Sequence, residues 1–134
     1  MKRFLYAILI MIGSAISANA SVLFPLFVDI APSYEEGLSE EFQAAGVEAA
    51  MYHSTKPDFL VSTFEAVEGF LKDTLPSDVT RTEQKIDDRI LVTYSSINRK
   101  DDTIETNPLM STIYVLSRPD NSYVAAYVEQ EIDN

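Results

Sequence analysis

The chain contains no cysteine and no tryptophan, and it has only one histidine and four glycines among its 134 residues. Without cysteine it cannot form a disulfide scaffold, a zinc ribbon, a catalytic thiolate or a lipidated-cysteine anchor. Three of the glycines (Gly37, Gly46 and Gly69) lie in helix-like segments, and none begins a phosphate-binding loop. Neither a Gly-x-Ser-x-Gly elbow nor a His-Glu-x-x-His pair occurs. These absences exclude the best-marked enzyme families.

Basic residues are also scarce. Ten Lys and Arg stand against 21 Asp and Glu, so the formal net charge is −11. Nucleic-acid binding needs clustered Lys and Arg for phosphate contacts, so we expect no nucleic-acid partner. Hydrophobic residues make up 46% of the chain, which is too high a share for a disordered protein. The length favours a single domain.

Residues 1–20 have the features of a secretory signal peptide. Lys2 and Arg3 precede the uncharged run FLYAILIMI, and residues 18–20 read Ala-Asn-Ala. Small residues one and three positions before a cut are typical of signal cleavage, which predicts cleavage after Ala20. An uncleaved anchor is the alternative, but the apolar run is shorter than the ~20 residues that a membrane span needs.

Cleavage would leave residues 21–134 as a single α+β domain with 8 basic and 21 acidic residues, a net charge of −13. We expect this domain to be exported to the periplasm or the extracellular space, with no membrane contact after cleavage. Small secreted domains of eukaryotes are often rich in disulfides, so the missing cysteines favour a bacterial cell envelope.

The first part of the mature chain predicts a strand followed by a helix. The segment Ser21–Ile30 is apolar, and Pro25 favours an edge strand or a loose tether. Ser33 and Glu36 have capping-box spacing and predict a helix start, and Ser39 offers a second start. Apolar residues then recur at helical spacing and predict one helix that ends near His53-Ser54: Leu38, Phe42, Ala45, Ala49 and Tyr52.

A second helix is predicted from Thr55-Lys56-Pro57-Asp58 to Leu75-Pro76, because an early Pro and Asp favour a helix start and the later Pro stops it. Its apolar positions give the strongest amphipathic pattern in the chain: Phe59, Leu60, Thr63, Phe64, Val67, Phe70 and Leu71. We expect its phenylalanines to supply much of the core.

After residue 79 the apolar pattern alternates with the period of a strand. The predicted elements are a polar edge strand (Val79–Asp87), a strand (Arg89–Ile97), a polar loop (Asn98–Pro108), a strand (Ser111–Ser117), a tight turn (Arg118–Asn121) and a central strand (Ser122–Ile132). Strand tyrosines are expected to pack within the sheet.

The order of elements predicts an α+β fold, with two N-terminal helices packed on a three- to four-stranded antiparallel meander. Cystatin-like folds, in which a curved sheet wraps around a helix, are similar in this coarse order. That similarity concerns the fold and fixes no function.

Few residues suggest catalysis or metal binding. His53 is a candidate general base that Glu48 or Asp58 could orient, and Ser54 is its neighbour in the sequence. Adjacency in sequence does not imply the geometry of a triad, so we favour a structural role for His53 at a helix C-terminus. The Asp-rich segment Asp101–Glu105 lacks the glycine and spacing of a calcium loop. We therefore predict no catalytic residues, no metal site and no cofactor.

Negative charge is concentrated in the predicted helices. The segment from Asp29 to Asp78 has 11 acidic and two basic residues, a net charge of −9, whereas residues 79–134 have a net charge of −4. Such a field favours a basic protein partner. The candidate binding residues are Glu35, Glu36, Glu40, Glu41 and Glu48.

Three functions are compatible with these features. The leading hypothesis is an acidic, exported binding domain of inhibitor or immunity type that acts by protein–protein interaction. The first alternative is a small-ligand pocket, with hydrolase or isomerase activity, between helices and sheet. The second is a structural component of the envelope, which would need an exposed apolar strand edge. The sequence predicts no oligomeric state.

Overall fold

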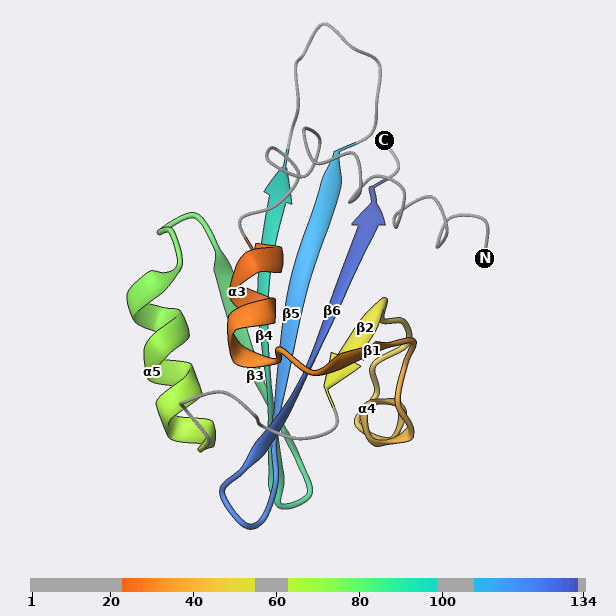
Figure 1. The fold of residues 1–134 in the computed structure, drawn as a ribbon, viewed down its shortest axis with the longest axis vertical. Helices are drawn as coiled ribbons and strands as arrows, with labels where there is room; N and C mark the ends of the chain where they lie inside the picture. The colour runs from red at the N-terminus through yellow and green to blue at the C-terminus, as the bar shows by residue number, and fades with distance from the viewer. Residues whose placement is uncertain (1–22, 55–62, 99–107, 133–134) are drawn as a thin grey trace, which may run out of the picture.

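A six-stranded antiparallel sheet, in the order β1-β2-β6-β5-β4-β3, forms the centre of the described structure (Figure 1). The computed structural model describes residues 23–54, 63–98 and 108–132. The strands are β1 (Tyr34–Glu36), β2 (Tyr52–Ser54), β3 (Thr80–Ile86), β4 (Arg89–Asn98), β5 (Leu109–Ser117) and β6 (Tyr123–Glu131). The α+β arrangement is confirmed, but the predicted sheet of three or four strands was too small. The proposed signal peptide lies outside the described residues.

The last strand in the chain lies in the middle of the sheet. Strand β6 pairs with β2 on one side and with β5 on the other. Its residues from Tyr123 to Val128 are all buried, so the strand is covered on both faces. The prediction of a central C-terminal strand is confirmed.

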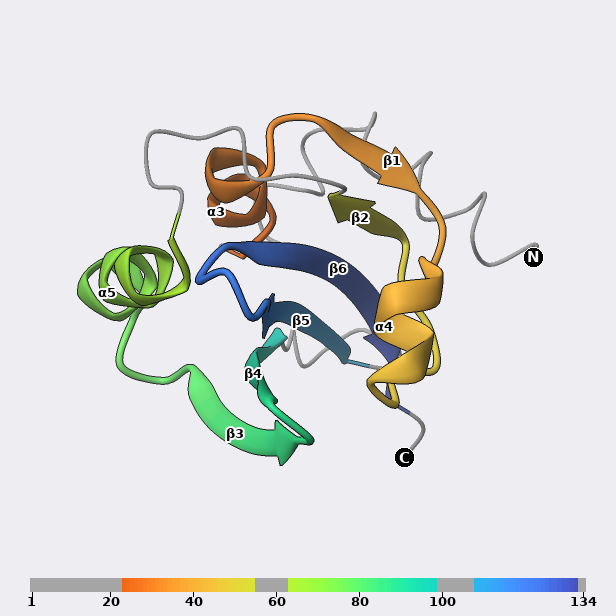
Figure 2. The same ribbon diagram turned by 90° about the horizontal axis from the view of Figure 1, so that it is seen from below.

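Two helices cover one face of the sheet, which we call the α3/α5 face (Figure 2). They are α3 (Leu23–Ile30) and α5 (Phe64–Thr74). The main core lies beneath them, and its fully buried members include Leu23, Phe27, Ile30, Val67, Leu71, Val92, Ile113, Val115, Tyr123, Ala125 and Tyr127.

The sequence left a strand or a loose tether open for Ser21–Ile30, and both interpretations were wrong for the described part of the segment, which is helix α3. Leu23, Phe27 and Ile30 are spaced by four and three residues, so a helix brings all three onto one buried face. Pro25 is compatible with this helix because it lies in the first turn, where a backbone N–H has no helical acceptor. The hydroxyl of Tyr123 donates a hydrogen bond of 2.6 Å to the Ile30 carbonyl and ties the helix end to β6.

Helix α5 begins later than the sequence predicted. Thr63 is its N-cap, and the Thr63 hydroxyl accepts a hydrogen bond from the amide of Ala66. The predicted start at Thr55–Asp58, with Phe59 and Leu60, lies outside the described residues. The predicted stop is confirmed, because Leu75 is the C-cap and Pro76 follows it.

A partly buried ion pair joins α5 to the edge of the sheet. Arg81 of β3 donates to both carboxylate oxygens of Glu68, at 2.9 and 3.0 Å from one guanidinium nitrogen. The hydroxyl of Tyr94 donates to the same carboxylate at 2.7 Å. Burial is the largest cause of the raised pKa of Tyr94, and the neighbouring Glu68 carboxylate adds to it.

The long helix predicted up to His53 is a short helix followed by a strand. Helix α4 (Glu40–Ala44) begins at its N-cap Ser39, as predicted, and the Ser39 hydroxyl accepts from the Phe42 amide. Gly46 adopts a φ of +94°, which ends the helix. The amides of Gly46 and Val47 donate to the carbonyls of Gln43 and Phe42, the Schellman pattern of a helix end.

The capping-box pattern of Ser33 and Glu36 gave a wrong prediction. The segment forms strand β1, in which Glu36 pairs with Tyr52 of β2. Tyr34 is stabilised there because its ring lies 5.0 Å from that of Tyr52 and 5.6 Å from that of Phe27. Aromatic packing on the sheet outweighs a local capping preference.

The elements after residue 79 agree with the prediction from the sequence. The predicted edge strand, two further strands and final strand correspond to β3, β4, β5 and β6. Asn121 has a φ of +71° in the turn before β6, a conformation that Asn tolerates better than most residues. Most of the predicted loop Asn98–Pro108 lies outside the described residues.

Candidate binding surface

The opposite side of the sheet is covered in part by α4, and we call it the α4 face (Figure 2). Alternate residues of β4 and β6 point to it, because side chains along a strand alternate between faces. A second, smaller hydrophobic cluster fixes α4 there: Phe42, Ala45, Val47, Leu91, Leu116, Val124 and Ala126. The Tyr114 ring packs beside it, 6.4 Å from the ring of Phe42.

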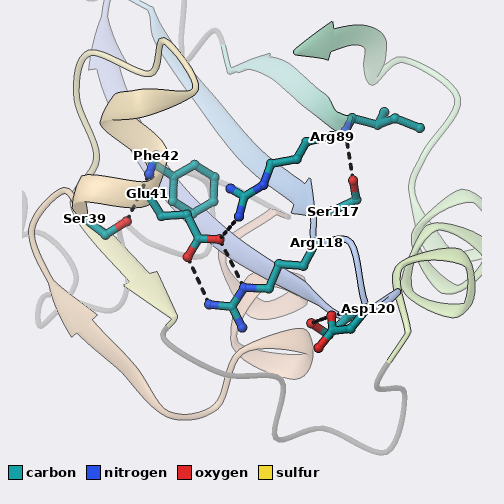
Figure 3. Close-up of polar contacts among 9 residues, drawn as sticks. Ser39, Glu41, Phe42, Arg89, Ser117, Arg118 and Asp120 are labelled. Carbon is teal, nitrogen blue, oxygen red and sulfur yellow. Dashed lines mark hydrogen bonds and ion pairs between the residues drawn. The ribbon is translucent and has the colours of Figure 1, made fainter. Parts of the chain in front are cut away.

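A second attachment of α4 is ionic, and we call it the Glu41 latch. Arg118 donates to both oxygens of the Glu41 carboxylate, at 2.9 and 3.1 Å (Figure 3). Arg89 approaches one of these oxygens at 3.1 Å. The two arginines come from the end of β5 and the start of β4, so the latch fixes α4 across two strands. The hydrogen bond from Arg118 is the main cause of the lowered pKa of Glu41.

The turn after β5 positions Arg118 for this contact. The amide of Arg118 donates to the carbonyl of Ser122 at 3.0 Å. The carboxylate of Asp120 accepts from both the amide and the hydroxyl of Ser122, at 3.0 and 2.6 Å. A local hydrogen-bonded turn therefore holds the arginine at the sheet end.

A hollow of about 410 Å³ lies between the chain that leaves α4 and the sheet, and we call it the first hollow. Small residues form one wall, at positions 45, 46 and 49. Polar side chains, two aliphatic side chains and the Tyr114 ring form the rest of the lining. Its lining is Ala45, Gly46, Val47, Glu48, Ala49, Gln84, Leu91, Thr93, Tyr114 and Gln130. Burial, with a contribution from the Glu48 carboxylate, raises the pKa of Tyr114.

A second hollow, of about 390 Å³, is partly lined by the turn between β3 and β4. Its lining is Glu41, Ala44, Ala45, Ile86, Asp87, Asp88 and Arg89. Ala45 lines both hollows, so α4 separates them. The first hollow is lined by one carboxylate and the second by three. Of the two, only the second contains a cation, the Arg89 guanidinium that is already paired with Glu41.

The five predicted binding residues lie in one stretch of chain but do not form one cluster. Glu35 and Glu36 are exposed on β1, and Glu40 is exposed in the first turn of α4. Glu48 is exposed and lines the first hollow. Glu41 differs from the others, because its side chain is only 24% exposed and is ion-paired inside the protein. Glu41 therefore has a structural role.

His53 lies in strand β2, so its predicted place at a helix C-terminus was wrong. Its Nδ1 donates to the carbonyl of Gly37 at 2.7 Å, and its Nε2 lies 3.9 Å from the Glu35 carboxylate. It contributes to the lining of neither hollow. His53 therefore joins β2 to the chain after β1.

Several residues of this surface were not predicted. Arg89 and Arg118 were assigned to a strand and a turn, and Tyr114 to sheet packing. Asp87 was placed at the end of the predicted edge strand, and Asp88 was given no role. The sequence signal that could have found them is charge at strand ends, because Arg89, Arg118 and the Asp pair all flank predicted strands.

No protein family, curated protein or solved structure that we compared matches this chain. In the part of the chain that the structure describes, no helix is long and apolar enough to cross a membrane. Nor do the described residues contain a group of three or more His, Asp or Glu side chains placed to hold a metal ion.

Proposed function

We propose that this protein is an exported, acidic domain that binds a basic protein through its α4 face. The observation that carries the proposal is the distribution of carboxylates around a filled core. Among the described residues, Glu40, Glu48, Asp87 and Asp88 are exposed and form no ion pair. They surround α4 and its two hollows. A concentration of one charge raises the rate of encounter with a partner of opposite charge.

The filled core supports a protein that binds its partner through its surface and not in an internal cavity. The described interior is packed with apolar side chains and tyrosines on both faces of the sheet. A small-ligand enzyme, the first alternative, would need a catalytic group in a hollow, and His53 lines neither of them. An envelope structural component, the second alternative, would need an apolar free edge, but the outer strand β3 reads TRTEQKI. Both alternatives have less support than the binding domain.

Export is the other part of the proposal, and it rests on the signal-peptide features of residues 1–20. We expect the exported protein to begin at Ser21. Intact-mass measurement of the protein recovered outside the cytoplasm tests this expectation. A mass that retains residues 1–20 would mean that the segment is an anchor.

The binding test compares two variants that lose equal charge. In the first, Glu40 and Glu48 become Gln and Asp87 and Asp88 become Asn, while Glu41 is kept because the fold uses it. In the control, Asp29, Glu65, Asp73 and Asp78 become Asn or Gln; these exposed residues lie on or just after α3 and α5. Both variants keep the ion pairs of Glu41 and Glu68, which attach α4 and α5 to the sheet, so both should fold.

Wild-type protein is used to capture a partner from the exported fraction of the host, and association rates are then measured at low and physiological salt. We expect the first variant to associate about tenfold more slowly than wild type at low salt, and the control to change less. An acidic partner, or equal rates for the first variant and wild type, would refute the proposal.

A further inference from the structure

The first hollow differs from the rest of the acidic surface because it combines a carboxylate, an aromatic ring and uncharged polar groups in one concave site. Glu48 supplies the carboxylate and Tyr114 the ring. Gln84, Thr93 and Gln130 supply amide and hydroxyl groups. No Lys or Arg is among its lining residues.

We infer that the first hollow receives a lysine or arginine side chain of the protein partner. The inference rests on the proposed function and names the group that this function would recognise. The hollow, at about 410 Å³, is at the lower end of the ~300–1,000 Å³ range of ligand pockets and so suits a side chain rather than a large cofactor.

The chemistry of the lining selects a cation. The Glu48 carboxylate attracts a positive charge, and the face of the Tyr114 ring attracts it too, through the ring quadrupole. The amide oxygens of Gln84 and Gln130 accept N–H hydrogen bonds. The alkyl stem of a lysine or arginine would contact Val47 and Leu91 while its charged end meets these groups. An anion would meet Glu48 with no compensating cation in the lining.

The conformation of the chain after α4 keeps this site open. Gly46, with a φ of +94°, turns the chain so that Glu48 follows directly along the wall of the hollow. No atom lies within 4 Å of the position that a Cβ at Gly46 would occupy, so the glycine is required for its backbone conformation and not for space. Helix α4 is fixed by the Glu41 latch and by Phe42, so the wall is held in place before a partner arrives.

The second hollow provides an internal comparison. Its lining has three carboxylates (Glu41, Asp87 and Asp88) and one cation, Arg89, which is paired with Glu41. It lacks the aromatic ring and the amide groups of the first hollow. A surface that attracted cations through lining charge alone would favour the second hollow, whereas selection by the ring and the amides predicts stronger binding at the first.

The test is an NMR titration of the ¹⁵N-labelled protein with Nα-acetyl-lysine N-methylamide and its arginine counterpart. Nα-acetyl-norleucine N-methylamide serves as the uncharged control of similar shape. We expect dose-dependent amide shifts at residues 46–49 and 114 with the charged probes, and none with the norleucine probe.

Variants then locate the site. Glu48→Gln should raise the Kd about fivefold, the upper range for an exposed ion pair. Tyr114→Phe keeps the ring and should stay within about twofold of wild type, whereas Tyr114→Leu should weaken binding by about two- to fivefold. Glu40→Gln and Asp88→Asn, which leave the first hollow intact, should stay within about twofold.

Equal shifts with norleucine, an unchanged Kd in Glu48→Gln, or shifts spread evenly over all acidic segments would overturn the inference. These outcomes are separable from failure of the proposed function. If the four-charge variant slows partner association but the lysine probe does not bind in the first hollow, the proposed function stands and the inference fails. If the four-charge variant associates at the wild-type rate, the proposed function fails, whichever result the titration gives.

Discussion

The two faces of the sheet differ in how they are held together. The α3/α5 face is a continuous layer of aliphatic and aromatic side chains. Tilted and edge-to-face ring pairs with centroids 5.0 to 6.3 Å apart join Phe24, Phe27, Tyr34, Tyr52 and Tyr127. The α4 face has a smaller apolar cluster, an ion-paired latch and two open hollows. One face therefore supplies most of the stability, and the other presents charge and concave surface to solvent.

Truncation of the main core should produce the largest effect. Phe27 is fully buried, and its ring lies 5.6 Å from the rings of Tyr34 and Tyr127. We expect Phe27→Ala to lower the free energy of unfolding by about 3–5 kcal/mol. Denaturant unfolding measures this loss. The control Ile97→Ala removes a side chain that is 47% exposed and should change stability by less than about 0.5 kcal/mol.

Alkaline pH should weaken the α3/α5 face through Tyr52. Burial raises the pKa of Tyr52 from 10.0 to about 12 in the folded protein. The fold therefore favours the neutral phenol, and this contribution is complete below pH 10 and is lost as the pH rises toward 12. A two-unit shift corresponds to roughly 2–3 kcal/mol.

The check is the denaturant midpoint of wild type and Tyr52→Phe at pH 7 and at pH 11.5. The variant should lose less stability between the two pH values than wild type does. An equal loss in both proteins would show that other groups cause the alkaline response.

Removal of the Glu41 latch should have a smaller effect, confined to the α4 face. Glu41→Gln removes the charge shared by Arg89 and Arg118 but keeps the side-chain length. We expect a loss of about 1–2 kcal/mol, because the pair is partly exposed. Hydrogen exchange should accelerate most at the amides of residues 42–47. Glu40→Gln, one residue earlier and exposed, is the matched control.

The same latch should make the α4 face sensitive to acid. The pKa of Glu41 lies below its ordinary value of 4.5. A lowered pKa means that the stabilisation is complete above pH 4.5 and is lost as the pH falls through the folded-state pKa. The stability difference between wild type and Glu41→Gln should therefore shrink as the pH falls below 4.5. A difference that stayed constant down to pH 2 would contradict the ionic account of the latch.

His53 should matter least. Its hydrogen bond to the Gly37 carbonyl is a single side-chain contact, so His53→Gln should cost about 0.5–1.5 kcal/mol. Any activity found for the protein should change only a few-fold. A hundredfold loss of activity with unchanged folding would instead identify a general base and would revive the enzyme alternative.

The sequence predicted the strands better than the first helices. Val92 and Tyr94, or Ala125 and Tyr127, alternate clearly with their neighbours, and the predicted strands agree with β3 to β6. The prediction failed for the region before residue 55, because apolar spacings of three and four residues also occur where a short helix is followed by a turn and a strand. The spacing predicts one helix that contains Leu38, Phe42, Ala45 and Tyr52. In the structure the helix ends earlier, because Gly46 adopts a left-handed backbone conformation.

The candidate surface was predicted only in part, for a different physical reason. Acidic composition showed where negative charge accumulates along the chain. It could not separate Glu41 from Glu40, because their roles depend on Arg89 and Arg118, which lie 48 and 77 residues beyond Glu41 in the sequence. Contacts between such distant positions leave no local periodicity, so only the folded structure distinguishes the structural carboxylate from the exposed one.

The position of β6 has a consequence for the newborn chain. This strand is made after all the other described strands, yet it separates β2 from β5, so the β1–β2 hairpin has no sheet to join until β6 emerges. The ring contact between Tyr127 and Phe27 and the hydrogen bond from the Tyr123 hydroxyl to Ile30 also form only after β6 has been made. Closing such long chain separations is slow compared with forming a local helix. The polypeptide should therefore reach its final sheet only after its last strand has emerged from the ribosome.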